Sequence, residues 1–232
     1  MSLYDLTHDI AATRRGHRLA LRLRADQARY DETANSVNGF LLEDPAQLTL
    51  SDDGLAFLKA YEGEVRDARG RHVLYDNDGG GHCTIGHGHL VHKGLCNGTD
   101  ASEQPFLQGL SDAQADALFR ADLQDRVRQV RDYLGAARLT QPMFDALCAL
   151  HFNVHTRPGW TLYRALKDRD YAQAACQMDV VTANGQLVRG LVNRRLAEIR
   201  LFLFGIGAAG EVCPGYLACR APDALPSLSD PV

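Results

Sequence analysis

Two carboxylates and one hydroxyl have the types and the spacing that could carry out chemistry. Glu62 ends the segment "SDDGLAFLKAYE", Asp78 opens the stretch "DGGGHCTIGHGH", and Thr84 lies six residues after Asp78. Hydrolysis of a glycosidic bond needs such a pair of carboxyl groups, because one protonates the leaving oxygen while the other orients a water or stabilises positive charge at the sugar carbon. The alternative is that Glu62 and Asp78 are two surface acids among the 29 of the chain.

The segment that carries Glu62 has the pattern of one short helix. Ser51 is a suitable N-cap, acidic residues follow it in the first turn, and Gly63 is a typical stop. We therefore predict a helix that ends near Glu62. The negative end of a helix dipole and partial burial both favour the protonated carboxyl group, which is the form that a general acid needs.

The glycine-rich stretch suggests two other kinds of site. A phosphate-binding loop requires a lysine and a hydroxyl after its last glycine, or a helix after G-x-G-x-x-G, whereas the residues after Gly86 favour a strand. A metal site is suggested by several possible ligands, which are His82, Cys83, His87, His89, His92 and Cys96. No pair has zinc-finger spacing except, loosely, His89 and His92. We therefore predict no metal site and expect these histidines to contact carboxylates or backbone carbonyls.

The elements that position these residues follow from hydrophobic periodicity. Short apolar pieces separated by glycines between residues 65 and 92 predict a small hairpin or a three-stranded sheet. Residues 111–204 have helical periodicity throughout, with a capping box at Ser111 and Gln114. A helix, a small sheet and a helical bundle in this order predict an α+β fold.

The predicted domain organisation has three parts. Residues 1–48 form an N-terminal extension, in which Leu19, Leu21 and Leu23 alternate as in a strand. Residues 49–204 form the main domain, with a small β lobe at about 64–95 and a helical lobe at about 110–204. Residues 205–232 contain prolines and scattered glycines, which are typical of a tail on the surface.

The composition excludes several classes of protein. The chain has 232 residues, a formal net charge of −4 and 45% hydrophobic residues, so it can bury a core but lacks the basic field of a general nucleic-acid-binding protein. We interpret the arginines near the N-terminus as a solvated face. No apolar run is long enough for stable membrane insertion, and charges interrupt the first 25 residues, so we expect no signal peptide.

The six cysteines leave the redox compartment open. Cys148 and Cys176 lie in apolar helical patterns and are predicted to be buried thiols. Cys213 and Cys219 are better placed for a local disulfide if the protein works in an oxidising compartment.

Five ordered motifs resemble those of one enzyme family. They are "YEG", "NDGGGHCTIGHGHLVH", "LTQPMFDALCALHFNV", "TLYRALKDRDYAQAA" and "GLVNRRLAEIRLFL". In this order they resemble the phage-type lysozymes, family 24 of the glycoside hydrolases, over about residues 50–204. The resemblance implies a lysozyme-like fold and a muramidase that hydrolyses the β-1,4 bond between N-acetylmuramic acid and N-acetylglucosamine in peptidoglycan, with no cofactor.

The resemblance also implies a role for each candidate residue. The glutamate of the motif "EG" corresponds to Glu62 as general acid, the aspartate before "GHCTIG" to Asp78, and the threonine of "TIGxGH" to Thr84. In an inverting mechanism Asp78 and Thr84 would hold the water on the face opposite Glu62. Glu64 and Asp76 are close rivals, but only Glu62 precedes the glycine and only Asp78 has the six-residue offset to Thr84.

Two further residues take supporting roles by the same resemblance. His89 matches the motif histidine, for which we expect a structural hydrogen bond. Asn153, in "FNV", is a candidate for substrate binding, with packing as the alternative.

Three features depart from the family pattern. The segment "EVRDARGRH" lengthens the interval between Glu62 and Asp78, so we expect a longer first strand or loop in the hairpin. His87 stands where an aromatic or aliphatic residue is common. His155 stands where the helix turn usually has glycine.

Two routes of delivery fit a muramidase without a signal peptide. A phage endolysin made in the cytoplasm would reach the periplasm or cell wall through a holin pore. An antibacterial effector would use a secretion machine and would have an immunity protein as partner. The competing hypotheses are a lysozyme-like module that only binds the wall or builds a virion, and a lytic transglycosylase.

Overall fold

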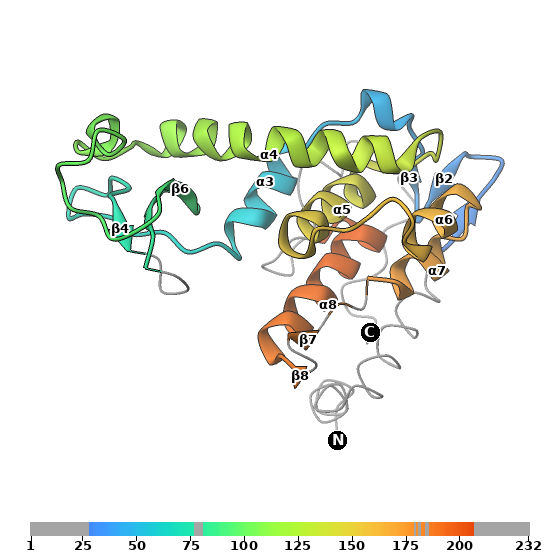
Figure 1. Ribbon diagram of the computed structural model, residues 1–232. Helices are drawn as coiled ribbons and strands as arrows, with labels where there is room; N and C mark the ends of the chain where they lie inside the picture. Colours follow the sequence, from blue (N-terminus) through green and yellow to red (C-terminus); the bar gives the residue numbers. More distant parts are fainter. Residues whose placement is uncertain (1–27, 77–80, 179, 181, 184–185, 207–232) are drawn as a thin grey trace, which may run out of the picture. The chain divides into compact units, whose positions relative to one another are not determined.

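The computed structural model describes residues 28–76, 81–178, 180, 182–183 and 186–206 (Figure 1). These residues belong to two compact units. The helical unit comprises the described residues up to Phe57 and from Val127 onward, and the β unit comprises Leu58–Arg126. The candidate catalytic residues Glu62 and Thr84 both lie in the β unit.

The helical unit contains most of the regular structure. Its helices are most of α3 (Asp52–Lys59), the end of α4 (Asp112–Leu134), α5 (Gln141–Val154), α6 (Thr161–Lys167), α7 (Tyr171–Cys176) and α8 (Arg189–Phe204). Its short elements are β1 (Tyr30–Asp31), β2 (Ser36–Val37), β3 (Phe40–Leu41), the 3-10 turn η1 (Pro45–Gln47), β7 (Thr182–Ala183) and β8 (Gln186–Leu187). The predicted helical bundle is therefore present.

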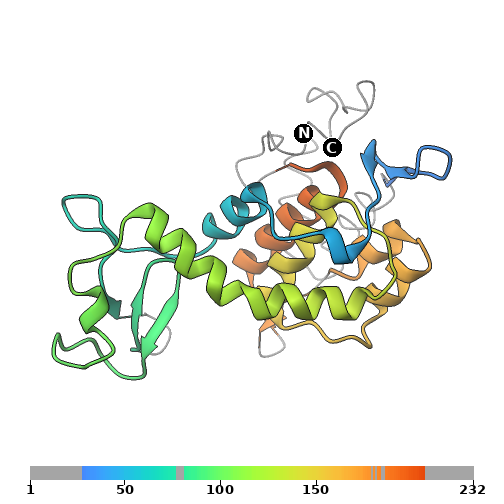
Figure 2. The same ribbon diagram turned by 90° about the horizontal axis from the view of Figure 1, so that it is seen from above.

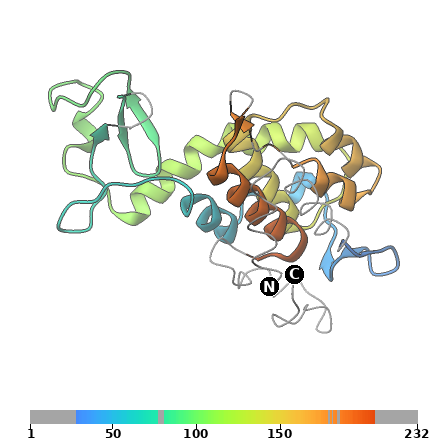
Figure 3. The same ribbon diagram turned by 90° about the horizontal axis from the view of Figure 1, so that it is seen from below.

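Helix α5 is the central element of this unit. The Thr140 hydroxyl accepts a hydrogen bond from the Met143 backbone N–H at 3.3 Å, which caps the first turn. Most of the helix is buried, and α8 packs alongside it, as Figures 1 and 3 show. The helix ends at His155, whose φ of 49° is left-handed. This conformation is the physical reason why a glycine suits that position.

Residues 30–48 pack into the helical unit. Strands β1, β2 and β3 form an antiparallel sheet in that order, and Val37 and Phe40 are almost fully buried. The Asn38 side chain donates a hydrogen bond to the Leu203 carbonyl at 2.8 Å. This part of the predicted extension thus contributes to the core, whereas the strand pattern at 19–23 lies outside the described residues.

The β unit is built on a second small antiparallel sheet. Strands β4 (Tyr75–Asp76), β5 (Cys83–Ile85) and β6 (His89–His92) pair in chain order beside the first turns of α4, as Figure 2 shows. A 3-10 turn, η2, covers Gln104–Phe106. The unit's small core consists of Ile85, Leu110 and Ala115, with partly buried apolar side chains around it. The predicted small sheet is confirmed.

The disulfide differs from the pair considered on sequence grounds. Cys83 and Cys96 are bonded, with an S–S distance of 2.09 Å. The pair Cys213 and Cys219 lies outside the described residues. Cys148 is a buried thiol, as predicted, but the prediction is wrong in degree for Cys176, which is only half-buried because it ends the short helix α7.

Within the described ranges, no helix combines the length and apolar character that a bilayer crossing requires.

Candidate active site

Glu62 lies in a turn that follows helix α3. The helix ends at Lys59, slightly earlier than predicted, and the Glu62 backbone N–H then donates to the Lys59 carbonyl at 3.2 Å. At the other end, the Ser51 hydroxyl accepts from the Gly54 N–H at 2.9 Å, in agreement with the predicted cap. The Glu62 residue is half-buried. The backbone at Glu62 is therefore held close to the helix end by a short, hydrogen-bonded turn.

Tyr75 pairs with Thr84 in the sheet, and its phenol is influenced by the charge of Glu62. Burial raises the pKa of the Tyr75 phenol, and the nearby charges of Glu62 and Glu64 raise it further. In the sheet Tyr75 lies directly opposite Thr84.

The Thr84 hydroxyl is fixed by its own strand. The residue is only 2% exposed, and its Oγ1 donates a hydrogen bond to the His82 carbonyl at 2.9 Å. Since this bond uses the hydroxyl proton, the oxygen lone pairs are left to accept a hydrogen bond. A water molecule is a suitable donor to such an oxygen.

Asp78 belongs to the connection between β4 and β5 and lies outside the described residues. Its rival Asp76 is described and has a different role. The Asp76 carboxylate accepts a hydrogen bond from the Cys96 backbone N–H at 2.8 Å, and Asp76 pairs with Cys83 in the sheet. This carboxylate therefore supports the disulfide-bonded loop.

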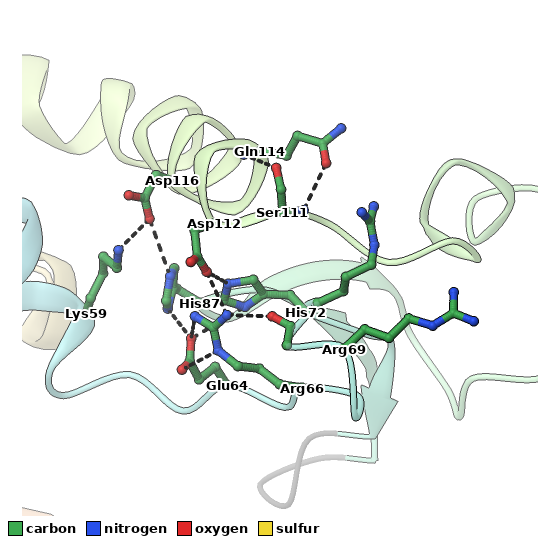
Figure 4. Close-up of polar contacts among 12 residues, drawn as sticks. Lys59, Glu64, Arg66, Arg69, His72, His87, Ser111, Asp112, Gln114 and Asp116 are labelled. Atoms are coloured by element: carbon green, nitrogen blue, oxygen red, sulfur yellow. Dashed lines mark hydrogen bonds and ion pairs between the residues drawn. The ribbon is translucent and has the colours of Figure 1, made fainter.

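The other rival, Glu64, is engaged by an arginine. Arg66 Nε donates to Glu64 Oε1 at 2.9 Å and Arg66 Nη2 donates to Glu64 Oε2 at 3.1 Å (Figure 4). These hydrogen bonds hold the pKa of the Glu64 carboxyl below its usual value. A carboxylate held in its ionised form is a poor proton donor, so Glu64 is poorly suited to be a general acid.

The segment "EVRDARGRH" folds into a hairpin of its own. The Val73 N–H donates to the Val65 carbonyl at 3.0 Å, and Asp67 accepts backbone hydrogen bonds from Arg69 and Arg71 at the tip. His72 then bridges to Leu110 through two backbone hydrogen bonds. The expected lengthening between Glu62 and Asp78 is thus an additional hairpin, which we call the inserted hairpin (residues 64–73).

The two supporting residues have described partners in different units. In the β unit, His89 Nδ1 lies 2.9 Å from Asp122 Oδ2 on α4. In the helical unit, Asn153 Oδ1 accepts a hydrogen bond from Arg195 Nη2 at 2.7 Å. Arg195 is fully buried and also contacts Glu198. Glu62, Thr84 and His89 therefore share a unit, and Asn153 belongs to the other.

Sequence reasoning missed a polar cluster in the β unit. It contains Glu64, His72 and His87, together with Asp112 and Asp116 of α4, and we call it the histidine cluster (Figure 4). His72 lies in the inserted hairpin, outside the glycine-rich stretch in which ligands were sought. Two features of the sequence could have indicated this cluster. His72 lies in an insertion, and His87 stands where an aromatic or aliphatic residue is common.

Comparisons with known proteins place the chain among lysozymes. The sequence profile of the phage lysozyme family matches residues 66–198, more than half of the chain. The endolysin of Lactococcus phage c2 is 29% identical over 161 residues, which are 67% of this chain and 60% of that protein. The chain thus spans about three fifths of the length of this curated relative. Glu62 lies just before the matched range, whereas Asp78, Thr84 and Asn153 lie within it.

Two solved structures show the same fold. The muramidase domain of SpmX from Asticaccaulis excentricus is 27% identical, with a TM-score of 0.51, and the match covers 68% of this chain and 99% of that one. A variant of the lysozyme of phage P22 is 28% identical, with a TM-score of 0.52, again covering 68% of this chain and 99% of that one. The fold is therefore lysozyme-like, as the sequence motifs predict.

Proposed function

We infer that this chain, which belongs to the phage lysozyme family, is a muramidase that hydrolyses the β-1,4 bond between N-acetylmuramic acid and N-acetylglucosamine in peptidoglycan. The family membership rests on the match over residues 66–198. The observation that supports the proposed site is the set of contacts that the neighbouring carboxylates, Glu64 and Asp76, already make. Glu64 is paired with Arg66, and Asp76 accepts a hydrogen bond from the Cys96 N–H, so these two acids already serve as structural partners in the β unit.

In the proposed reaction Glu62 donates a proton to the glycosidic oxygen as the bond to the muramic acid carbon breaks. Asp78 accepts a proton from a water, and the Thr84 oxygen accepts a hydrogen bond from the same water, which attacks the sugar carbon from the opposite face. Such an inverting arrangement requires carboxyl groups about 6.5 to 9.5 Å apart. The products are two shorter glycan chains, one with a new reducing end.

Asn153 is proposed to bind the glycan. Its Oδ1 accepts the hydrogen bond from Arg195. This contact orients the amide so that the Nδ2 group can donate to a sugar or acetamido oxygen. If Asn153 binds the glycan, Asn153→Leu should raise KM while the far-ultraviolet circular dichroism stays unchanged. If Asn153 only packs, a leucine of similar volume should leave KM unchanged.

We propose that the protein works in an oxidising compartment at the cell wall. The Cys83–Cys96 disulfide supports this, because structural disulfides persist mainly outside the reducing cytosol. A phage endolysin and a secreted antibacterial effector both end their route there. The similarity to a phage endolysin favours the first route, and the second would require an immunity protein as a partner.

The deciding experiment compares wild type, Glu62→Gln and Glu32→Gln on isolated peptidoglycan. Turbidity and new reducing ends are followed together. Removal of the general acid should lower the rate by about 10²-fold or more. The Glu32→Gln control makes the same chemical change at an exposed position of the helical unit and should leave the rate unchanged.

Each other outcome of this experiment points to a different function. Equal clearing by wild type and Glu62→Gln would remove Glu62 from its role. Anhydromuramic products without reducing ends would indicate a lytic transglycosylase. Binding of wild type to peptidoglycan without any cleavage would indicate a wall-binding or virion module.

A further inference from the structure

The histidine cluster brings two imidazole rings onto one carboxylate. His72 Nδ1 lies 3.4 Å and His87 Nδ1 lies 3.7 Å from the same atom, Glu64 Oε2. The rings meet edge to face, with centroids 5.1 Å apart. The three residues come from different segments of the β unit: the inserted hairpin supplies Glu64 and His72, and the turn after β5 supplies His87 (Figure 4).

Three of the four ring nitrogens of His72 and His87 lack hydrogen bonds among the described residues. His72 is 0% and His87 is 4% exposed, and His72 Nδ1, His87 Nδ1 and His87 Nε2 have no hydrogen-bond partner among the described residues. A buried polar atom without a hydrogen-bond partner is energetically unfavourable, and a bound cation would satisfy it.

The opposite nitrogen of each ring faces an aspartate on α4. His72 Nε2 lies 3.1 Å from Asp112 Oδ1, and His87 Nε2 lies 3.6 Å from Asp116 Oδ1. The two aspartates are one helical turn apart, so each can serve one ring. Histidines that bind a metal usually donate their second N–H to a carboxylate, as His72 Nε2 can to Asp112, whereas His87 Nε2 lies near Asp116 without a hydrogen bond.

The spacing of the inner atoms is close to that around a tetrahedral metal. Ligand atoms about 2.1 Å from zinc lie about 3.4 Å from one another. One ligand atom from each of Glu64, His72 and His87 lies within 4.8 Å of the other two. The distances from Glu64 Oε2 are 3.4 Å to His72 Nδ1 and 3.7 Å to His87 Nδ1.

The charges around the cluster also favour a cation. The three carboxylates of Glu64, Asp112 and Asp116 outnumber the two cations, Arg66 and Lys59, that form ion pairs with them. Arg66 does not block the site, because a carboxylate oxygen has two lone pairs and Glu64 Oε2 can accept from Arg66 with one and bind a metal with the other.

We propose that Glu64 Oε2, His72 Nδ1 and His87 Nδ1 bind one divalent transition-metal ion, with Zn²⁺ as the best fit, and that this ion ties the inserted hairpin to β5 and α4. Two imidazoles and one carboxylate suit zinc, whereas Mg²⁺ and Ca²⁺ prefer oxygen ligands alone. The second group of possible ligands, Cys83, His92 and Glu103, is unsuitable because the Cys83 sulfur is in the disulfide. Stoichiometric zinc binding in the following experiment would correct the prediction from sequence that these histidines bind no metal.

The test measures metal binding directly. Full-length protein is stripped with a chelator, dialysed, and titrated with ZnCl₂ by calorimetry, with metal content determined by elemental analysis. Wild type should bind one zinc per chain and show ligand shifts at the Nδ1 atoms of two histidines by nitrogen-15 NMR. Glu64→Gln and His87→Gln should each weaken zinc binding at least tenfold.

The matched control is His89→Gln, which removes a histidine of the same unit that contacts Asp122 instead. Its zinc affinity should equal that of wild type. Circular dichroism and thermal unfolding of each metal-free variant show whether the fold persists, and partly exposed Glu64 is the substitution least able to disturb it. Absence of stoichiometric uptake by wild type, or equal zinc affinity in wild type, Glu64→Gln and His87→Gln, would overturn the proposal. Neither result bears on Glu62, because no step of the test measures peptidoglycan cleavage.

Discussion

At the scale of single residues, carboxylates only a few positions apart have different surroundings. Arg66 keeps Glu64 ionised, and Asp76 accepts the Cys96 N–H. Glu62 lies in the turn after α3, close enough to Tyr75 for its charge to raise the pKa of the phenol. The chemistry available to each acid therefore depends on its neighbours rather than on its place in the motif.

Substitution of Thr84 tests the proposed water-binding hydroxyl. Thr84→Val removes the hydroxyl at nearly constant volume, and we expect kcat on peptidoglycan to fall by about 10²-fold, the usual size of a lost positioning or proton-transfer group. The lost bond to the His82 carbonyl should also lower the free energy of unfolding by about 1 kcal/mol. Thr84→Ser keeps the hydroxyl and should recover most of the rate. Equal rates for Thr84→Val and wild type would show that the hydroxyl has only a structural role.

His92 and Glu103 should make the stability of the β unit depend on pH. His92 Nε2 lies 2.7 Å from Glu103 Oε1 and its Nδ1 lies 3.1 Å from the Lys93 carbonyl, so both ring nitrogens face acceptors. The hydrogen bond to Glu103 raises the pKa of His92 above 6.5, and the same bond lowers the pKa of Glu103 below 4.5.

The sign of the effect follows from these directions. The contribution of His92 to the free energy of unfolding is complete below pH 6.5 and is lost as the pH rises through its raised pKa. The contribution of Glu103 is complete above pH 4.5 and is lost as the pH falls through its lowered pKa. The difference in Tm between wild type and His92→Gln should thus be largest between these values and shrink as the pH rises through the raised pKa of His92. A difference that stays constant over this range would contradict the charged pair.

At the scale of elements, the approach of α3 to α5 depends on one glycine. A Cβ atom on Gly54 would lie 2.5 Å from the Asp145 carboxyl carbon. Asp145 is fully buried and accepts hydrogen bonds from the Ser51 N–H, the Ser51 hydroxyl and the Gln141 amide. Because these bonds also anchor the cap of α3, the aspartate has little freedom to move away.

We therefore expect Gly54→Ala to lower the free energy of unfolding by about 1–3 kcal/mol, the usual cost of overpacking. This is opposite in sign to the gain of about 0.5–1 kcal/mol that alanine usually brings inside a helix. Gly190→Ala in α8 is the matched control, since nothing lies within 4 Å of its added Cβ, and it should be neutral or stabilising. Chemical denaturation measures both, and a stabilising Gly54→Ala would refute the close contact.

At the scale of the whole molecule, the two units differ in what stabilises them. The helical unit buries long apolar faces of α5 and α8, including Phe144, Leu147 and Phe202. Among its described residues, the β unit has a small core around Ile85 and Leu110, to which the Cys83–Cys96 disulfide is added. Small cores usually need such covalent or metal links.

Loss of the disulfide should consequently affect the β unit selectively. A loop with a sequence separation of 13 residues is worth about 3 kcal/mol in the chain-entropy model. In the Cys83→Ser/Cys96→Ser variant we expect faster amide hydrogen exchange in residues 58–126 and unchanged exchange in α5 and α8. Uniform loss of protection across both units would show that they unfold together.

The sequence by itself determined the order of elements and the identity of the fold. The Ser51 cap, the alternation around Cys83–Ile85 and the helical periodicity after Ser111 are local patterns, and hydrophobic period and capping act over a few neighbouring residues. The ordered motifs were enough to identify the family. Local spacing also separated Glu62 from Glu64 as a candidate, through the glycine that follows it.

Only the tertiary structure decided which side chains meet across distant segments. Three features join segments whose separation along the chain follows no periodic pattern. They are the pairing of Cys83 with Cys96, the burial of Val37 and Phe40, and the meeting of Glu64, His72 and His87. The inserted hairpin brings His72 to His87 because its backbone bridges to Leu110. Contacts of this kind depend on three-dimensional packing, which sequence spacing does not encode.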